Sequence, residues 1–230
     1  MSHPVRLRSP SQFSALRVID PRYAGAEDVV GVGDDLSPDT LRWAYRHGIF
    51  PWPVDNLPLL WFCPAERAVL DFAHLHIPRR LLRFQSQCPY TFTINTAFDR
   101  MVNACRRAPR PGQDGTWITP AIQSAYSLLH RLGDAHSVEV WNEQGALVGG
   151  LYGVSVGGAF AGESMFHAVP NASKLALLHL IRHLQGRSLG WIDIQMMTPH
   201  MQVLGASLLP RDAFLDTLDA EQARGLSLFD

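Results

Sequence analysis

The sequence predicts an α/β protein whose main domain is built on a mixed, largely antiparallel sheet. From residue 90 onward, segments with strand-like and helix-like spacing follow one another in the order β-α-α-β-β-β-α-β-α-β-α. Residues 147–156 and 159–166 form a predicted hairpin, because the Gly157-Gly158 pair between them permits the positive φ of a tight turn. Residues 171–185 then repeat apolar side chains at helical spacing, which predicts a helix that crosses the sheet to reach the next strand.

The composition sets limits on organisation and location. A chain of 230 residues can hold one large domain or two unequal ones, and we expect a small N-terminal domain over residues 1–74, with the first 30 residues poorly structured, and a second domain over 75–230. The sequence contains no apolar run of about 18 residues, so we expect no membrane span. Three widely spaced cysteines, Cys63, Cys88 and Cys105, argue against a disulfide framework or a zinc site and fit a reducing cytoplasm.

The first half of the chain contains a well-capped helix followed by a rigid turn. Ser37 is a good N-cap and Pro38 suits the first helical position, which predicts a helix over 38–47. Two prolines then force residues 49–53 into an extended path. On the residues alone, Trp52 in this segment is either a core residue or part of a stacking surface. Strands are expected over 59–62 and 68–72.

The remaining elements alternate between helices and strands. Three consecutive strands, then a helix and another strand, resemble the order of the GNAT-type acyltransferase fold, although a fold alone does not establish chemistry. In chain order we expect a helix from Pro78, a strand at 90–94, a helix at 96–107, a loop at 108–115, a helix from 119 to 133, a strand at 136–141, the hairpin and helix described above, a strand at 191–196, a helix at 199–204, a strand at 206–209 and a helix from Arg211.

The net charge of −1 conceals a basic segment. Between Pro78 and Pro111 there are seven arginines and a single acid, Asp99, which gives this window a charge of +6. Such a local field attracts polyanions. The alternative is a solvated arginine face balanced by acids elsewhere in the fold.

Polar residues within apolar strands are the best candidates for chemistry. The sequence lacks the HExxH, GxSxG, P-loop and GxGxxG motifs, and the His179/His183 pair has no third ligand placed beside it. Glu163 lies in GESMF, while Asp193 and Gln195 lie in WIDIQMM two positions apart, on one side of a predicted strand. A carboxylate and an amide side by side can hold an amine and steer its attack. The alternative is the polar outer face of a half-buried strand.

A series of motifs carries a resemblance to a known family. In order they are GDDLSPDTLRWAYRHGIFPWP, LLWFCPAERAVL, TWIT, AHSVEVW, LVGGLYGV, GESMF, NASKLAL, IDIQ and LGA. This series resembles leucyl/phenylalanyl-tRNA–protein transferase from about Gly31 to Leu218. The resemblance implies a small N-terminal domain packed on a GNAT-like domain, and transfer of Leu or Phe from aminoacyl-tRNA to proteins with N-terminal Arg or Lys, which marks them for degradation. It implies no metal and no cofactor, and a cytoplasmic monomer.

The same resemblance implies roles for particular residues. Trp52 would stack on the terminal adenosine of the tRNA, and Glu163, Asp193 and Gln195 would form the polar centre where the amine attacks the ester. The other implied substrate-binding residues are Tyr45, Trp117, Leu151, Phe160, Met165, Leu180, Leu184 and Ile192, and the implied tRNA-binding residues are Arg79, Arg80 and Arg83. Three positions near the centre differ from the family pattern: His167-Ala168 replaces Ser-Arg, and Ile194 replaces Cys.

The expected reaction is direct aminolysis of the tRNA ester. Because an ester is already an activated acyl donor, the enzyme mainly aligns the α-amine and stabilises the oxyanion. Gln195, oriented by Asp193, is expected to accept hydrogen bonds from the amine. Apolar pocket walls discriminate by size and separate Leu, Phe and Met poorly. Two alternatives are a GNAT-like N-acyltransferase that uses acyl-CoA, and a catalytically inactive relative that binds RNA or protein.

Overall fold

The computed structural model describes residues 16–109 and 116–229, and within them the chain forms two sheets. The smaller sheet is antiparallel and has the strand order β1-β2-β4-β3. Its strands are β1 (Arg17–Val18), β2 (Val29–Val32), β3 (Phe50–Trp52) and β4 (Leu60–Phe62). Strand β3 is the proline-containing segment that was expected to be extended, and it lies at the edge of the sheet, where a missing N–H is tolerated.

Helix α1 (Pro38–Arg46) forms where its N-cap predicts it. The Ser37 hydroxyl accepts a hydrogen bond from the backbone N–H of Thr40, and Pro38 occupies the first turn. The helix buries Leu41, Ala44 and Tyr45, the face that packs toward the larger sheet. Tyr45 is thereby carried from the N-terminal part of the chain to the main domain.

The larger sheet has seven strands in the order β11-β5-β10-β9-β8-β7-β6 and is antiparallel except for the β9/β10 pair. The expected mixed, largely antiparallel sheet and the order of elements from residue 90 are therefore confirmed. The strands are β5 (Glu66–Asp71), β6 (Thr91–Ile94), β7 (Ala135–Trp141), β8 (Leu147–Val156), β9 (Ala159–His167), β10 (Trp191–Gln195) and β11 (Ser207–Pro210).

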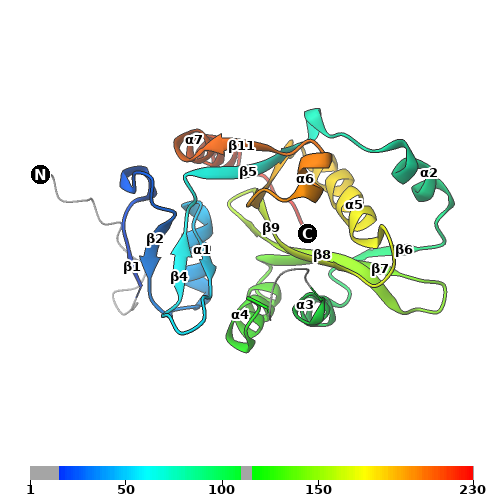
Figure 1. Ribbon diagram of the computed structural model, residues 1–230, viewed down its shortest axis with the longest axis horizontal. Coiled ribbons are helices and arrows are strands. Elements are labelled where there is room, and N and C mark those ends of the chain that lie inside the picture. The colour runs from blue at the N-terminus through cyan, green and yellow to red at the C-terminus, as the bar shows by residue number, and fades with distance from the viewer. Residues whose placement is uncertain (1–15, 110–115, 230) are drawn as a thin grey trace, which may run out of the picture.

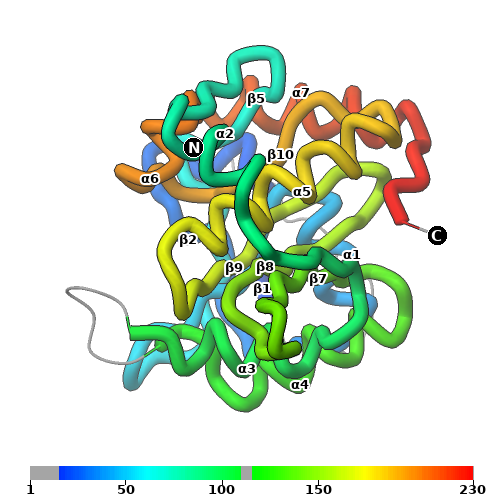
Figure 2. Tube along the Cα trace, turned by 90° about the vertical axis from the view of Figure 1, so that its right-hand side faces the viewer, coloured from blue at the N-terminus to red at the C-terminus, as the bar shows by residue number. Residues whose placement is uncertain are grey.

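Helices cover both faces of this sheet. Helices α3 (Phe98–Arg107) and α4 (Pro120–Arg131) lie on one face, and α5 (Ala172–Gly186) lies on the other, as both ribbon views show (Figures 1 and 2). The remaining helices are α2 (Arg79–Gln87), α6 (Pro199–Val203), α7 (Arg211–Ala223) and the short 3-10 turns η1 (Pro21–Tyr23) and η2 (Phe72–His74). No helix in the described ranges is long and apolar enough to span a membrane.

Strands β9 and β10 separate soon after they meet. Their parallel pairing consists of Asp193 opposite Ala161, and beyond this point β9 continues through Gly162–His167 without a partner on that side. The separation leaves a gap between the two strands, and side chains of α5 and α6 line it. This gap positions the candidate site.

A glycine-rich strand lets α5 approach the sheet. A Cβ added at Gly149 of β8 would lie 2.4 Å from the Cβ of Ala172, at the first position of α5. The register of β8 against β9 also shifts between Tyr152 and Gly153. The glycines of this hairpin therefore mark a close helix contact and a bulge, the two alternatives that glycine within a strand indicates.

Residues 17–32 are ordered parts of the fold, whereas the sequence predicts a poorly structured segment up to residue 30; residues 1–15 lie outside the described ranges. The order comes from contacts distant in sequence: β2 pairs with β4, and the Arg211 guanidinium donates to the carbonyls of Pro21, Gly25, Glu27 and Cys63. The division after residue 74 stays a prediction. Strand β5, which precedes it, belongs to the larger sheet.

Candidate active site

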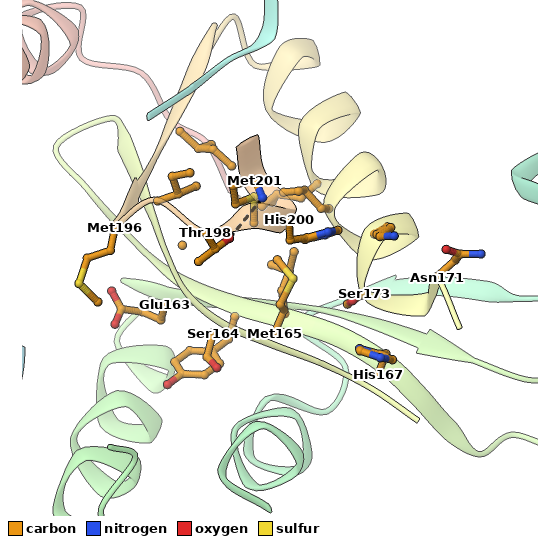
Figure 3. A pocket seen from close by; sticks show the side chains of 18 of the residues that line it. Glu163, Ser164, Met165, His167, Asn171, Ser173, Met196, Thr198, His200 and Met201 are labelled. Carbon is orange, nitrogen blue, oxygen red and sulfur yellow. Dashed lines mark hydrogen bonds between the residues drawn. The ribbon is translucent and has the colours of Figure 1, made fainter. Parts of the chain in front are cut away.

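The principal cavity occupies the gap between β9 and β10 and has a volume of about 740 Å³ (Figure 3). Four of the six residues expected to form an apolar pocket line it: Leu151, Met165, Leu180 and Ile192. The other two, Phe160 and Leu184, are buried in the same hydrophobic core but do not reach the cavity surface. They belong to the same hydrophobic cluster as the lining residues Leu151, Leu180 and Ile192.

Glu163 lies on β9 at one end of this cavity, and three side chains meet its carboxylate. Its Oε1 atom accepts hydrogen bonds from the Tyr45 hydroxyl and from Gln195 Nε2, both at 2.7 Å, and its Oε2 atom accepts from the Tyr126 hydroxyl at 3.2 Å. The two tyrosine oxygens are also 2.5 Å apart. Residues from α1, α4, β9 and β10 thus converge on one carboxyl group.

Burial controls the protonation of this cluster. It raises the pKa of Glu163 to about 7, against the opposing effect of the hydrogen bonds from Tyr45 and Gln195. It also raises the pKa of Tyr45 and of Tyr126 well above the ordinary value for a phenol. The three oxygen–oxygen contacts among these residues need three protons, of which the hydroxyls supply two. When Glu163 is protonated it supplies the third: its carboxyl O–H then donates to the Tyr126 oxygen, and the Tyr126 hydroxyl donates to the Tyr45 oxygen.

Asp193 takes part in a buried ion pair. Its carboxylate accepts from Arg67 Nε at 2.8 Å and from Arg67 NH2 at 2.6 Å, and the Arg67 side chain is 1% exposed. The guanidinium lies between the rings of Phe50 and Phe214, with centroid distances of 4.7 and 4.6 Å. With both carboxylate oxygens held in this way, Asp193 does not face the cavity.

Gln195 is anchored through the same carboxylate. Its backbone N–H donates to Asp193 Oδ1 at 2.8 Å, and its φ is +63°, a left-handed value that non-glycine residues rarely adopt. The register of β10 against β5 shifts between Asp193 and Gln195. The two side chains have different partners, Arg67 for Asp193 and Glu163 for Gln195, and the expectation that they form one surface stays a prediction.

Trp52 and Trp117 form an aromatic pair at the edge of the N-terminal sheet. Their ring centroids are 5.0 Å apart at an interplanar angle of 19°, and both side chains are partly exposed. Trp52 also makes an edge contact with Phe50, which packs against Arg67. Trp52, expected to stack on the terminal adenosine, and Trp117, expected to bind substrate, are therefore side by side, and Trp52 is both packed and accessible.

The three arginines expected to bind RNA lie on α2. Arg79, Arg80 and Arg83 are exposed, and none of them forms an ion pair with another described residue. This arrangement leaves their charges available to a partner. Their assignment to tRNA stays a prediction.

Sequence reasoning missed two residues of this site. Tyr126 lies in the predicted helix from 119 to 133 but was not among the expected site residues, and Arg67 was placed outside the predicted strand at 68–72. A charged residue directly before a run of apolar strand residues was the available signal for Arg67. Its partner is 126 positions away, so no local pattern could reveal the pair.

The histidines at i and i+4 on α5 serve aromatic packing. His179 stacks on Phe92 at 5.1 Å, and His183 stacks on Phe229 at 4.8 Å. Within the described ranges, no group of three or more His, Cys, Asp or Glu side chains is arranged to bind a metal ion.

Comparisons with known proteins decide the family. The family described as "Leucyl/phenylalanyl-tRNA protein transferase" matches residues 69–219, and that family's N-terminal domain matches residues 34–65. The chain belongs to this family. The predicted family and the predicted aminoacyltransferase are thereby confirmed.

Curated relatives agree over nearly the whole chain. A protein of Maridesulfovibrio salexigens named leucyl/phenylalanyl-tRNA–protein transferase is 46% identical over 199 residues, which cover 86% of this chain and 83% of the relative. One of Chromohalobacter salexigens with the same name is 45% identical over 210 residues, covering 91% and 81%. The solved structure of L-PGS from Bacillus licheniformis aligns with a TM-score of 0.38 and 13% identity over 66% of this chain and 48% of that chain, too low a similarity to support an argument.

Proposed function

We propose that the protein transfers Leu or Phe, and also Met, from aminoacyl-tRNA to the N-terminal Arg or Lys of acceptor proteins. This transfer marks the acceptor proteins for degradation. The observation that carries this proposal is the position of Glu163 at one end of a large apolar cavity, where its carboxylate accepts a hydrogen bond from Gln195 behind the cavity wall. The apolar side chain of the acyl group needs an apolar pocket, and the cationic acceptor needs a carboxylate. This site places the two next to each other, because Glu163 lies at the end of the apolar cavity.

The cavity supports binding of the donor's side chain. Its walls at Leu151, Met165, Leu180 and Ile192 are apolar, so a Leu or Phe side chain entering it leaves water without giving up hydrogen bonds. Such walls select by size, and Met has a similar volume. The terminal adenosine would stack on the Trp52–Trp117 pair.

Gln195 is the residue best placed to orient the attacking amine. Its Nε2 atom donates to Glu163, which leaves Oε1 to accept an N–H of the amine. The amine nitrogen then bonds to the ester carbonyl carbon, the bond from that carbon to the ribose oxygen breaks, and the proton lost by nitrogen passes to the ribose oxygen. Asp193 contributes by holding the backbone of Gln195, since its own oxygens are engaged by Arg67.

Glu163 would bind the positive charge of the acceptor. Its pKa of about 7 means that a nearby cation drives it to the ionised form at neutral pH. The tyrosine hydroxyls and Gln195 then stabilise the resulting carboxylate as donors. Recognition of an N-terminal Arg or Lys is thus accompanied by release of a proton.

The direct test uses purified protein, leucyl-tRNA and a peptide that begins with Arg. The expected result is a mass gain of one leucyl residue at the peptide's N-terminus. A peptide of the same sequence that begins with Glu, and acyl-CoA in place of leucyl-tRNA, serve as controls and should give no product. Absence of transfer to the Arg peptide, or equal transfer to both peptides, would overturn the proposal.

A further inference from the structure

A second, smaller cavity adjoins the principal one. It has a volume of about 260 Å³ and lies between α2, the start of α5 and α6. We call it the α2–α5 groove; it is lined by Pro78, Arg80, Leu81, Asn171, Lys174, His200, Val203 and Leu204. Asn171, Lys174 and His200 also line the principal cavity, so the two spaces meet along these three side chains.

The groove is basic and contains no acidic side chain. Arg80 and Lys174 face it from different helices, and Lys174 is the only lysine in the 230-residue sequence. Glu163, the one carboxylate that lines the principal cavity, lies at the other end, away from Asn171 and His167 (Figure 3). The two connected cavities therefore have an acidic end and a basic end.

Within the described part of the chain, each of three polar side chains at the junction lacks one kind of contact. His200 Nε2 is buried and has no hydrogen bond, the Asn171 side chain does not cap the helix that follows it, and Lys174 has no ion pair with any described residue. Buried polar groups are normally satisfied, so the unsatisfied His200 nitrogen requires an explanation. A single anion with several acceptor oxygens could satisfy all three side chains.

The electrostatics at the junction point the same way. Burial lowers the pKa of His200, and the charges of Lys174 and His167 lower it further. Helix α5, with fifteen residues, has no acid in its first turn, so the positive end of its dipole is not neutralised there. A bound anion would relieve this concentration of positive charge.

We propose that the α2–α5 groove binds a phosphodiester group from the single-stranded 3′ end of the donor RNA, with Lys174 and Arg80 as the charged contacts. This inference rests on the proposed function, which supplies a donor with one phosphate per nucleotide. The acceptor bears a cation and belongs at the Glu163 end, so charge assigns the groove to the donor. The groove also connects the principal cavity to Arg80 on α2, the helix that carries the exposed Arg79 and Arg83.

The test compares three donors that differ in their phosphates. Leucyl-tRNA carries the whole backbone, the leucyl ester of the trinucleotide CCA carries only the phosphates of the 3′ end, and leucyl-adenosine carries none. Lys174→Gln should weaken binding of the first two about 10-fold and reduce the salt dependence of tRNA binding by about one phosphate contact. It should leave binding of leucyl-adenosine unchanged.

Two further variants control for charge and folding. Lys174→Arg keeps the charge and should restore most of the lost affinity. Arg131→Gln removes an exposed charge from the end of α4, on the opposite face of the sheet, and should bind all three donors like the unmodified protein. Equal losses for all three donors in Lys174→Gln would overturn the inference.

A chemical footprint of the unmodified protein avoids the variants altogether. Because Lys174 is the sole lysine, acetylation of its side chain is read from one peptide by mass spectrometry. The trinucleotide CCA, with no amino acid attached, should protect it from acetylation, while adenosine, which has no phosphate, should not. Equal protection by inorganic phosphate or by an acidic peptide would overturn the assignment to RNA. If the protein transfers no leucine from any donor, the proposed function fails, and protection by CCA still decides whether the groove binds RNA.

Discussion

Two carboxylates on neighbouring strands of this protein have opposite electrostatic environments. Glu163 on β9 is held by neutral donors at the end of a cavity, and its pKa rises to about 7. Asp193 on β10 accepts hydrogen bonds from two of the three guanidinium nitrogens of Arg67 within the core. Burial alone therefore does not determine the role of a carboxylate. The partner determines it: neutral donors leave Glu163 able to change its charge, whereas Asp193 forms a buried ion pair with Arg67.

The comparison assigns the two residues different functions. A group that titrates near neutral pH can respond to a cation that arrives and leaves. A group in a buried ion pair is suited to holding a neighbour in place, and here that neighbour is the strained backbone of Gln195. Gln195 connects the two carboxylates: its backbone N–H donates to Asp193, and its side-chain amide donates to Glu163.

Breaking the ion pair should give the largest effect. Asp193→Ala leaves Arg67 charged, buried and unpaired, and should lower the free energy of unfolding by about 3–5 kcal/mol, as measured by denaturant titration. The double variant Arg67→Met/Asp193→Leu should recover most of this stability. Its kcat should nevertheless stay about 10²-fold low, because Gln195 has lost its backbone anchor. A double variant with full activity would show that Asp193 does not position Gln195.

Removing the connecting side chain should affect the reaction more than the fold. Gln195→Ala should lower kcat about 10²-fold, the scale for loss of a positioned catalytic group, while the free energy of unfolding changes by less than about 1 kcal/mol. Single-turnover transfer and denaturant titration measure the two quantities. Gln222→Ala, which removes an amide that donates to the Arg46 carbonyl at the surface, is the matched control and should retain the full rate. An unchanged rate in Gln195→Ala would remove it from the chemistry.

The smallest expected effect concerns the pH dependence of stability at Glu163. Its folded pKa of about 7 lies above the ordinary value of 4.5, so the folded state keeps a proton that the unfolded state has lost. The stabilisation this gives is complete below pH 4.5 and is lost as the pH rises through 7. Relative to Glu163→Gln, which cannot ionise, the native protein should lose on the order of 2–3 kcal/mol between pH 4.5 and pH 8. Parallel stability curves for the two proteins would contradict the raised pKa.

Local patterns predicted most of the fold and part of the site. Caps, prolines and glycine turns placed α1, β3 and the β8–β9 hairpin, because each depends on neighbouring residues. Glu163 and Gln195 were recognisable as polar residues in apolar strands. The sequence also suggested that Asp193 orients Gln195, but the ion pair of Asp193 with Arg67 was missed, because Arg67 lies 126 positions away in the chain. Residues 17–32 were underestimated for the same reason, since their order depends on distant partners.

The contacts of Arg211 bear on how the protein is synthesised. This residue at the start of α7 holds four carbonyl groups that lie between residues 21 and 63, and Arg22 in turn pairs with Asp216 and Asp219. Residues 21–27 therefore depend on contacts with α7. These contacts can form only after α7 has been synthesised, close to the end of translation.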